Sequence, residues 1–182
     1  MMNTKRVKQA ILGLSIAALG ILIAGCSQSG IDVGSNAETS EKLNAYILGE
    51  SPGEAITVSQ ARESAKPGGA IVVSGRIGAS HKPFGGGFAT LVLGDESLQY
   101  CNEIPGDACE TPWDACCEDR PKIIANRASV QLLADGFPIA ESLKGAGGLT
   151  ELDQIVVVGF VDLSSTSDNL IINASGIYRE SN

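Results

Sequence analysis

Residues 154–162 read Gln-Ile-Val-Val-Val-Gly-Phe-Val-Asp and contain the longest β-branched run in the chain. Four consecutive β-branched residues favour a strand over a helix, and an apolar run without polar alternation is typical of a strand covered on both faces. We therefore expect a central strand here. Its two faces would carry Val156, Val158 and Phe160 on one side and Ile155, Val157 and Val161 on the other.

The rest of the chain supplies partners for this strand. Period-two patterns predict four further strands, over residues 71–77, 88–93, 129–134 and 170–178. The polar stretch 164–169 predicts a turn that makes a hairpin of the last two strands.

Short helices are expected before the first strand. Thr57 and Gln60 have the spacing of a capping box that opens a helix through about Ala65, and the sequence Lys-Pro-Gly-Gly at 66–69 ends it. Apolar residues at helical spacing predict one or two turns docked on the domain: Leu43, Tyr46, Ile47 and Leu48.

Several of these patterns resemble the oligonucleotide/oligosaccharide-binding (OB) fold. They are Gly75 in the first strand, the stretch from Leu152 to Gly159, and the stretch from Asn169 to Ile177. In OB folds, glycines permit sharp coiling of the first and fourth strands. The resemblance implies an all-β domain over residues 55–182, a small five-stranded OB-like barrel with a Cys-rich insertion between strands two and three. Another small antiparallel barrel or sandwich is the alternative.

The N-terminus has the pattern of an export signal. Lys5, Arg6 and Lys8 precede a run of 16 residues, 10–25, in which Ser15 is the only side chain that is neither apolar nor glycine. That run is shorter than the roughly 20 residues of a transmembrane helix and predicts a signal peptide over residues 1–25. Its end, Leu-Ile-Ala-Gly-Cys, resembles a bacterial lipobox.

The lipobox resemblance implies that Cys26 is acylated, with palmitate-type chains, and becomes the first mature residue. The mature protein would then be held on the lipid bilayer, facing the periplasm, and Ser27 after the cysteine favours the outer membrane. Residues 26–54 are expected to form a lipidated tether and the docked helical turn.

Charge argues against nucleic acid as a partner. Cleavage removes three of the 13 basic residues and none of the 21 acidic ones, so 10 basic residues face 21 acidic ones and the net charge is −11. Nucleic-acid binders need a basic stripe, and no Lys/Arg cluster follows Lys8. An envelope protein or a small ligand is the expected partner besides the bilayer.

The insertion at residues 95–128 carries the remaining cysteines, Cys101, Cys109, Cys116 and Cys117. Four cysteines in an oxidising compartment favour two disulfides. A direct Cys116–Cys117 bond would require a strained turn, so we expect each to pair with Cys101 or Cys109. The segment is polar, and we expect little besides the cross-links to hold it.

A thiolate metal site for zinc or copper, with His81 as a further candidate ligand, is the alternative. The spacing argues against it, because there is no Cys-x2-Cys and adjacent cysteines do not easily point at one tetrahedral ion.

Trp113 and Asp114 are candidate binding residues, although packing of the indole on a disulfide is favoured. Catalysis has little support, because His81 is the only histidine and no Gly-x-Ser-x-Gly motif is present. The stretch around Thr111-Pro-Trp-Asp-Ala-Cys-Cys-Glu118 is similar to uncharacterised exported lipoproteins of planctomycete-like bacteria. The sequence thus predicts a non-catalytic envelope binding module, with a metal-binding or redox protein second and a carbohydrate-active enzyme third.

Overall fold

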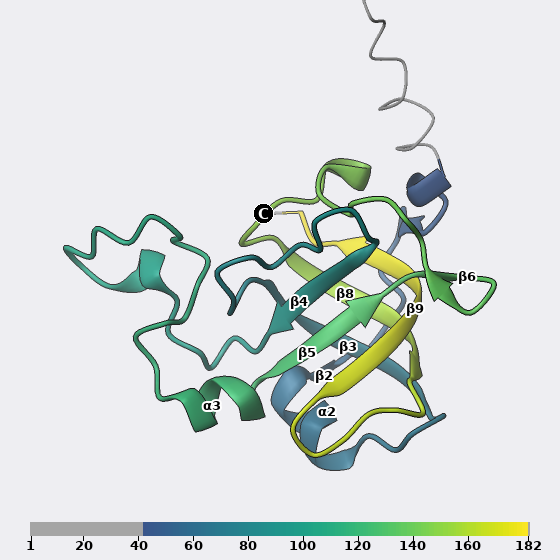
Figure 1. Cartoon of the computed structure of the whole chain (residues 1–182), viewed down its shortest axis with the longest axis horizontal. Coiled ribbons are helices and arrows are strands. Elements are labelled where there is room, and N and C mark those ends of the chain that lie inside the picture. The colour runs from purple at the N-terminus through teal and green to yellow at the C-terminus, as the bar shows by residue number, and fades with distance from the viewer. Residues whose placement is uncertain (1–41, 182) are drawn as a thin grey trace, which may run out of the picture. The chain divides into compact units, whose positions relative to one another are not determined.

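The computed structural model describes residues 42–181 (Figure 1). The predicted signal peptide, the acylation of Cys26 and most of the predicted tether lie outside these residues. Within the described part, no helix is both long and apolar enough to cross a membrane.

Five strands form a closed barrel (Figure 1). They pair in the cyclic order β3, β4, β5, β9, β8 and back to β3, with β5 and β9 parallel and the other neighbours antiparallel. This order is that of an OB-like barrel, so the predicted fold class is confirmed. The strands are β3 (Ala70–Ile77), β4 (Thr90–Gly94), β5 (Arg127–Gln131), β8 (Gln154–Val161) and β9 (Leu170–Arg179).

Strand β8 is central, as its sequence predicts, because it pairs with β3 along one side and β9 along the other. Val157 is 0% exposed and faces the core, whereas Phe160 is 54% exposed. The expectation of burial on both faces is therefore wrong for Phe160. A register shift at Val158/Gly159 bends the strand, and a Cβ on Gly159 would lie 2.2 Å from the Asn173 carbonyl oxygen.

Helix α2 (Val58–Ser64) packs against β3 and β5. Its capping box is confirmed: the Thr57 side chain accepts from the Gln60 amide, and the Gln60 side chain accepts from the Thr57 amide. Val58 and Ala61 bury completely in the barrel core. Gly68, at φ 79°, continues the turn that ends the helical region.

The segment before α2 differs from the prediction. Leu43 is buried and residues 42–44 are helical, but Ile47 and Leu48 form strand β1 (Ile47–Leu48), parallel to β9. The reason is that the edge of β9 supplies free backbone groups: the Ile177 amide donates to the Tyr46 carbonyl at 2.8 Å. A second outer strand, β2 (Ile56–Thr57), pairs with β3.

The third predicted strand is split. Strand β5 ends at Gln131, and the chain continues into a separate hairpin of β6 (Leu133–Ala134) and β7 (Phe137–Pro138). Asp135 and Gly136 link these strands with φ of 53° and 82°, the combination that a two-residue type I′ turn requires.

Candidate functional site: a cluster of four cysteines

The predicted cysteine-rich insertion runs from the end of β4 to the start of β5. It contains the 3-10 turn η1 (Cys101–Glu103) and helix α3 (Arg120–Ala125). A small apolar cluster holds it, made of Ala79, Leu98, Tyr100 and Ala115 with Ile123 and Leu152 against them. The expectation that only cross-links would hold this segment is therefore wrong, because a few large side chains suffice to form a satellite core.

Tyr100 is the largest side chain of this cluster and is 0% exposed. Glycines allow the ring to approach the barrel: a Cβ on Gly94 would lie 2.3 Å from the Tyr100 hydroxyl oxygen, and one on Gly78 would lie 2.8 Å from a ring carbon. Arg76 of β3 covers the ring, with its guanidinium carbon 4.5 Å from the centroid. Burial, the dominant cause, raises the pKa of Tyr100, so the phenol stays neutral.

The stretch from Thr111 to Ala115 docks beside η1 through its backbone. The Asp114 carbonyl accepts from the Cys101 amide at 2.8 Å, and the Pro112 carbonyl accepts from the Asn102 amide at 3.0 Å. On the other side, the Trp113 carbonyl accepts from the Ala79 amide at 2.9 Å. This short stretch thus joins η1 to the end of β3.

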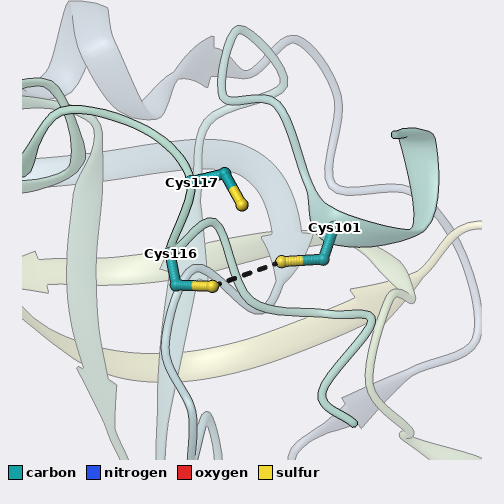
Figure 2. Close-up of side chains that lie close together, drawn as sticks. All are labelled: Cys101, Cys116 and Cys117. Carbon is teal, nitrogen blue, oxygen red and sulfur yellow. Dashed lines mark hydrogen bonds between the residues drawn. The ribbon is translucent and has the colours of Figure 1, made fainter. Parts of the chain in front are cut away.

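A tight turn then presents the adjacent cysteines. The Glu118 amide donates to the Ala115 carbonyl at 3.0 Å, so Cys116 and Cys117 are the two central residues of the turn. Figure 2 shows the three sulfur atoms of Cys101, Cys116 and Cys117 facing a common space. The Cys101 and Cys116 sulfurs lie 3.6 Å apart, and all three sulfurs lie within 4.8 Å of one another.

Cys109 approaches Cys101 from the opposite arm of the segment. Its sulfur, the Cys101 sulfur and a carboxylate oxygen of Asp107 lie within 4.8 Å of one another. Asp107 also accepts from the Cys109 amide at 3.1 Å, which fixes that turn. Cys101, which is buried, is therefore the shared member of two groups of donor atoms.

All four cysteines are free thiols in the structure. The predicted disulfides are not formed: the 3.6 Å between the Cys101 and Cys116 sulfurs compares with about 2.05 Å for a disulfide. The adjacent cysteines were expected not to point easily at one ion, but their two sulfurs lie on the same side of the turn, close to the sulfur of Cys101. The turn at 115–118 lets both sulfurs approach Cys101 without a bond between neighbours.

The thiols differ in their acid–base behaviour. Burial, followed by the hydrogen bond with Cys116, raises the pKa of the Cys101 thiol to about 12. The hydrogen bond between Cys109 and the Thr111 side chain, the largest cause, lowers the pKa of the Cys109 thiol. The buried thiol of Cys101 thus lies between the more exposed thiols of two neighbouring groups.

The remaining predicted site residues lie outside the cluster of donor atoms. His81 is exposed and its ring belongs to neither group of candidate ligands in the described chain, although its carbonyl accepts from the Trp113 indole at 3.2 Å. The Trp113 ring is half-buried, consistent with packing. Asp114 uses a side-chain oxygen to accept from the Ala115 amide at 2.8 Å, so its role is to shape the turn.

Sequence reasoning missed three residues that position the cluster. Arg76 contacts Glu103 at 2.5 Å, and Glu103 in turn accepts from the Tyr100 amide. Asp107 is the third. A lone arginine within the apolar pattern of the first strand is the signal that could have identified Arg76.

A search against models of known protein families gives no match for this chain. A search of curated proteins gives no match either.

Proposed function

We propose that this chain is a non-catalytic binding module of the bacterial cell envelope and that its ligand is a soft metal ion held by the four cysteines. The observation that carries the proposal is the 3.6 Å separation of the Cys101 and Cys116 sulfurs, with the Cys117 sulfur close to both. Cys109, from the second group, supplies the fourth sulfur.

The separation fits two ligands of one ion better than it fits a cross-link. Zinc–sulfur bonds of about 2.3 Å at tetrahedral angles place neighbouring sulfurs about 3.8 Å apart. The Cys101–Cys116 distance lies within a few tenths of an ångström of that edge. A disulfide would instead join Cys101 to one partner only and would require their sulfurs to approach to about 2.05 Å.

Thiolates select the metal class. Sulfur donors favour zinc and copper(I) over calcium or magnesium, which prefer oxygen. We propose zinc as the resident ion, because four sulfurs complete a closed tetrahedral structural site. Such a site would add folding free energy to a segment that otherwise rests on a small apolar cluster.

The proposed location rests on the N-terminal sequence. Export through the predicted signal peptide and acylation of Cys26 would place the barrel on the periplasmic side of a membrane. Ser27, directly after the acylated cysteine, favours the outer membrane. In that compartment thiols are exposed to oxidants, so bound metal would be what keeps the four sulfurs from pairing.

The experiment measures metal and thiols in the same sample. The acylated protein is extracted from membranes under anaerobic, alkylating conditions without added reductant, and its metal content is determined by mass spectrometry. We expect about one zinc ion per chain, four cysteines that alkylate only after chelation, and tetrahedral thiolate charge-transfer bands when cobalt(II) replaces the metal.

Matched variants locate the site. Cys101→Ser should abolish stoichiometric metal, because Cys101 belongs to both groups of donors, whereas Asp119→Asn, an exposed acidic residue nearby, should leave it unchanged. Four cysteines that resist alkylation until reduced, with no bound metal, would overturn the proposal. Cys101–Cys116 would then be the pairing that the geometry favours for a cross-linked binding module.

A further inference from the structure

We infer a second binding site, independent of the cysteines: a cavity of about 800 Å³ beside the β6–β7 hairpin that takes a small organic ammonium ion with an apolar body. The volume lies within the range of small-molecule pockets. One wall comes from the hairpin and the residues after it, including Phe137, Pro138, Ile139 and Glu141. The other wall comes from the residues just before β1, including Tyr46.

The floor of this cavity is preformed. Tyr46 and Ile139 both pack against the main barrel core. Backbone bonds fix them: the Ile139 carbonyl accepts from Ala89 at 2.8 Å, its amide donates to Leu132 at 3.0 Å, and the Tyr46 carbonyl accepts from Ile177. A ligand would therefore meet a rigid apolar surface, which lowers the entropy cost of binding.

Phe137 stands at the mouth of the cavity and is 75% exposed. The Asp135-Gly136 turn holds the ring there, since both residues adopt the positive φ that the tight hairpin needs. An aromatic ring that is mostly exposed contributes little to folding. At the edge of an apolar cavity it offers a face to a ligand.

Glu141 decides the chemical class of that ligand. Its Oε2 atom is buried, accepts no hydrogen bond in the structure, and belongs to a residue of the cavity lining. A buried acceptor without a partner is costly and is normally satisfied. The other charged lining residue, Lys42, is exposed and does not satisfy it.

A protonated amine matches the carboxylate and the aromatic part of this wall, while the exposed Lys42 can keep its ammonium group in solvent. Its N–H groups would donate to the Glu141 carboxylate once that side chain turns toward the ligand, and its positive charge would lie close to Tyr46 and Phe137, which line the same cavity. An anion would be repelled by Glu141, and a wholly apolar ligand would leave the Oε2 atom buried without a partner. The ligand class is therefore cationic with an apolar body.

The test uses three probes of the same shape. The mature protein, labelled with nitrogen-15, is titrated with 2-phenylethylammonium, with the neutral 2-phenylethanol and with the anionic 3-phenylpropionate, and amide shifts are followed. We expect the ammonium probe to shift the amides of residues 45–46, 137 and 139–141 and to bind at least tenfold more tightly than the alcohol.

Substitutions assign the effect to the carboxylate. Glu141→Gln keeps the shape and should weaken ammonium binding about tenfold while leaving alcohol binding unchanged. Glu63→Gln, an exposed carboxylate on α2 outside the cavity, should have no effect. Phe137→Ala should weaken binding severalfold, whereas Phe160→Ala, also exposed but outside the cavity lining, should not.

Equal affinity for ammonium and alcohol, shifts confined to other parts of the barrel, or full ammonium affinity in Glu141→Gln would each overturn the inference. Metal content measured on the same variants separates the two sites, because Glu141→Gln leaves all four cysteines in place.

Discussion

The guanidinium of Arg76 lies over the ring of Tyr100, 4.5 Å from its centroid, and joins the first barrel strand to the base of the cysteine cluster. The same guanidinium contacts Glu103 in η1, two residues after Cys101. Because Arg76 is fixed by β3, the barrel sets the position of the cluster.

Arg76→Ala should therefore loosen the cysteine-rich segment while leaving the barrel intact. Loss of the cation–π contact and the half-exposed ion pair should cost about 1–2 kcal/mol of local stability. Hydrogen exchange is expected to accelerate for amides of residues 98–104 and not for β8. Arg120→Ala, on the exposed start of α3, is the control. Equal acceleration in β8 would show that the effect is global.

Val157→Asp should unfold the barrel at neutral pH or shift its thermal midpoint strongly downward. Val157 is completely buried in β8, and an unpaired carboxylate there must be neutralised or exposed, at a cost of at least about 4 kcal/mol. Phe160→Asp, on the exposed side of the same strand, should cost much less. Similar midpoints for the two variants would contradict the register of β8.

Asp95→Asn should make stability less dependent on pH. Asp95 is buried and accepts from the Ser59 amide at 2.7 Å and the Ser97 amide at 3.0 Å. Burial opposes ionisation, but these hydrogen bonds outweigh it and lower the pKa of Asp95. The pKa of Asp95 in the folded protein thus lies below its value of about 4 in the unfolded chain. The ionised Asp95 carboxylate therefore contributes its full stabilisation of the fold above pH 4, and this contribution is lost as the pH falls further.

Denaturant titrations at pH 7 and pH 2.5 measure this effect. At pH 7 the variant should be less stable than the natural protein by about 1–3 kcal/mol, and at pH 2.5 the difference should shrink. Asp119→Asn, an exposed carboxylate without a side-chain hydrogen bond to its helix, is the control. A difference that stays constant across the two pH values would contradict the assignment.

Cys26→Ala should block processing, since only a thiol at that position accepts the diacylglycerol group before signal cleavage. We expect an uncleaved precursor that retains residues 1–25 and incorporates no labelled palmitate. Ser27→Ala should still be cleaved and acylated. Normal maturation of the alanine variant at position 26 would contradict the lipoprotein proposal.

Much of the fold could be predicted because the barrel depends on local patterns. The five strands, the capping box at Thr57 and the hairpin after β8 each follow from alternation or from turn residues within a short window. The pairing of Ile47 with Ile177 could not be predicted this way, because it depends on an open edge of β9 that exists only once the barrel has formed.

The residues of the cysteine cluster could be predicted from the sequence, but the way their sulfur atoms approach one another could not. Spacing identified the four cysteines, but the approach of Cys117 to Cys101 depends on a turn defined by one backbone bond from Glu118 to Ala115. The cavity was missed altogether. The Asp135-Gly136 pair is a strong local hairpin signal and could have indicated the turn, but the orphaned oxygen of Glu141 is visible only in three dimensions.

Closure of the barrel also limits how copies of this protein can associate. Every barrel strand has a partner on each side, and the strands that the described chain has outside the barrel, β1, β2, β6 and β7, are only two residues long. Exposed strand edges are the templates on which chains add to one another and begin to aggregate. Copies of this protein that meet, as they would often do on a membrane surface if the proposed acylation holds, therefore find almost no exposed strand edge on which to add a strand.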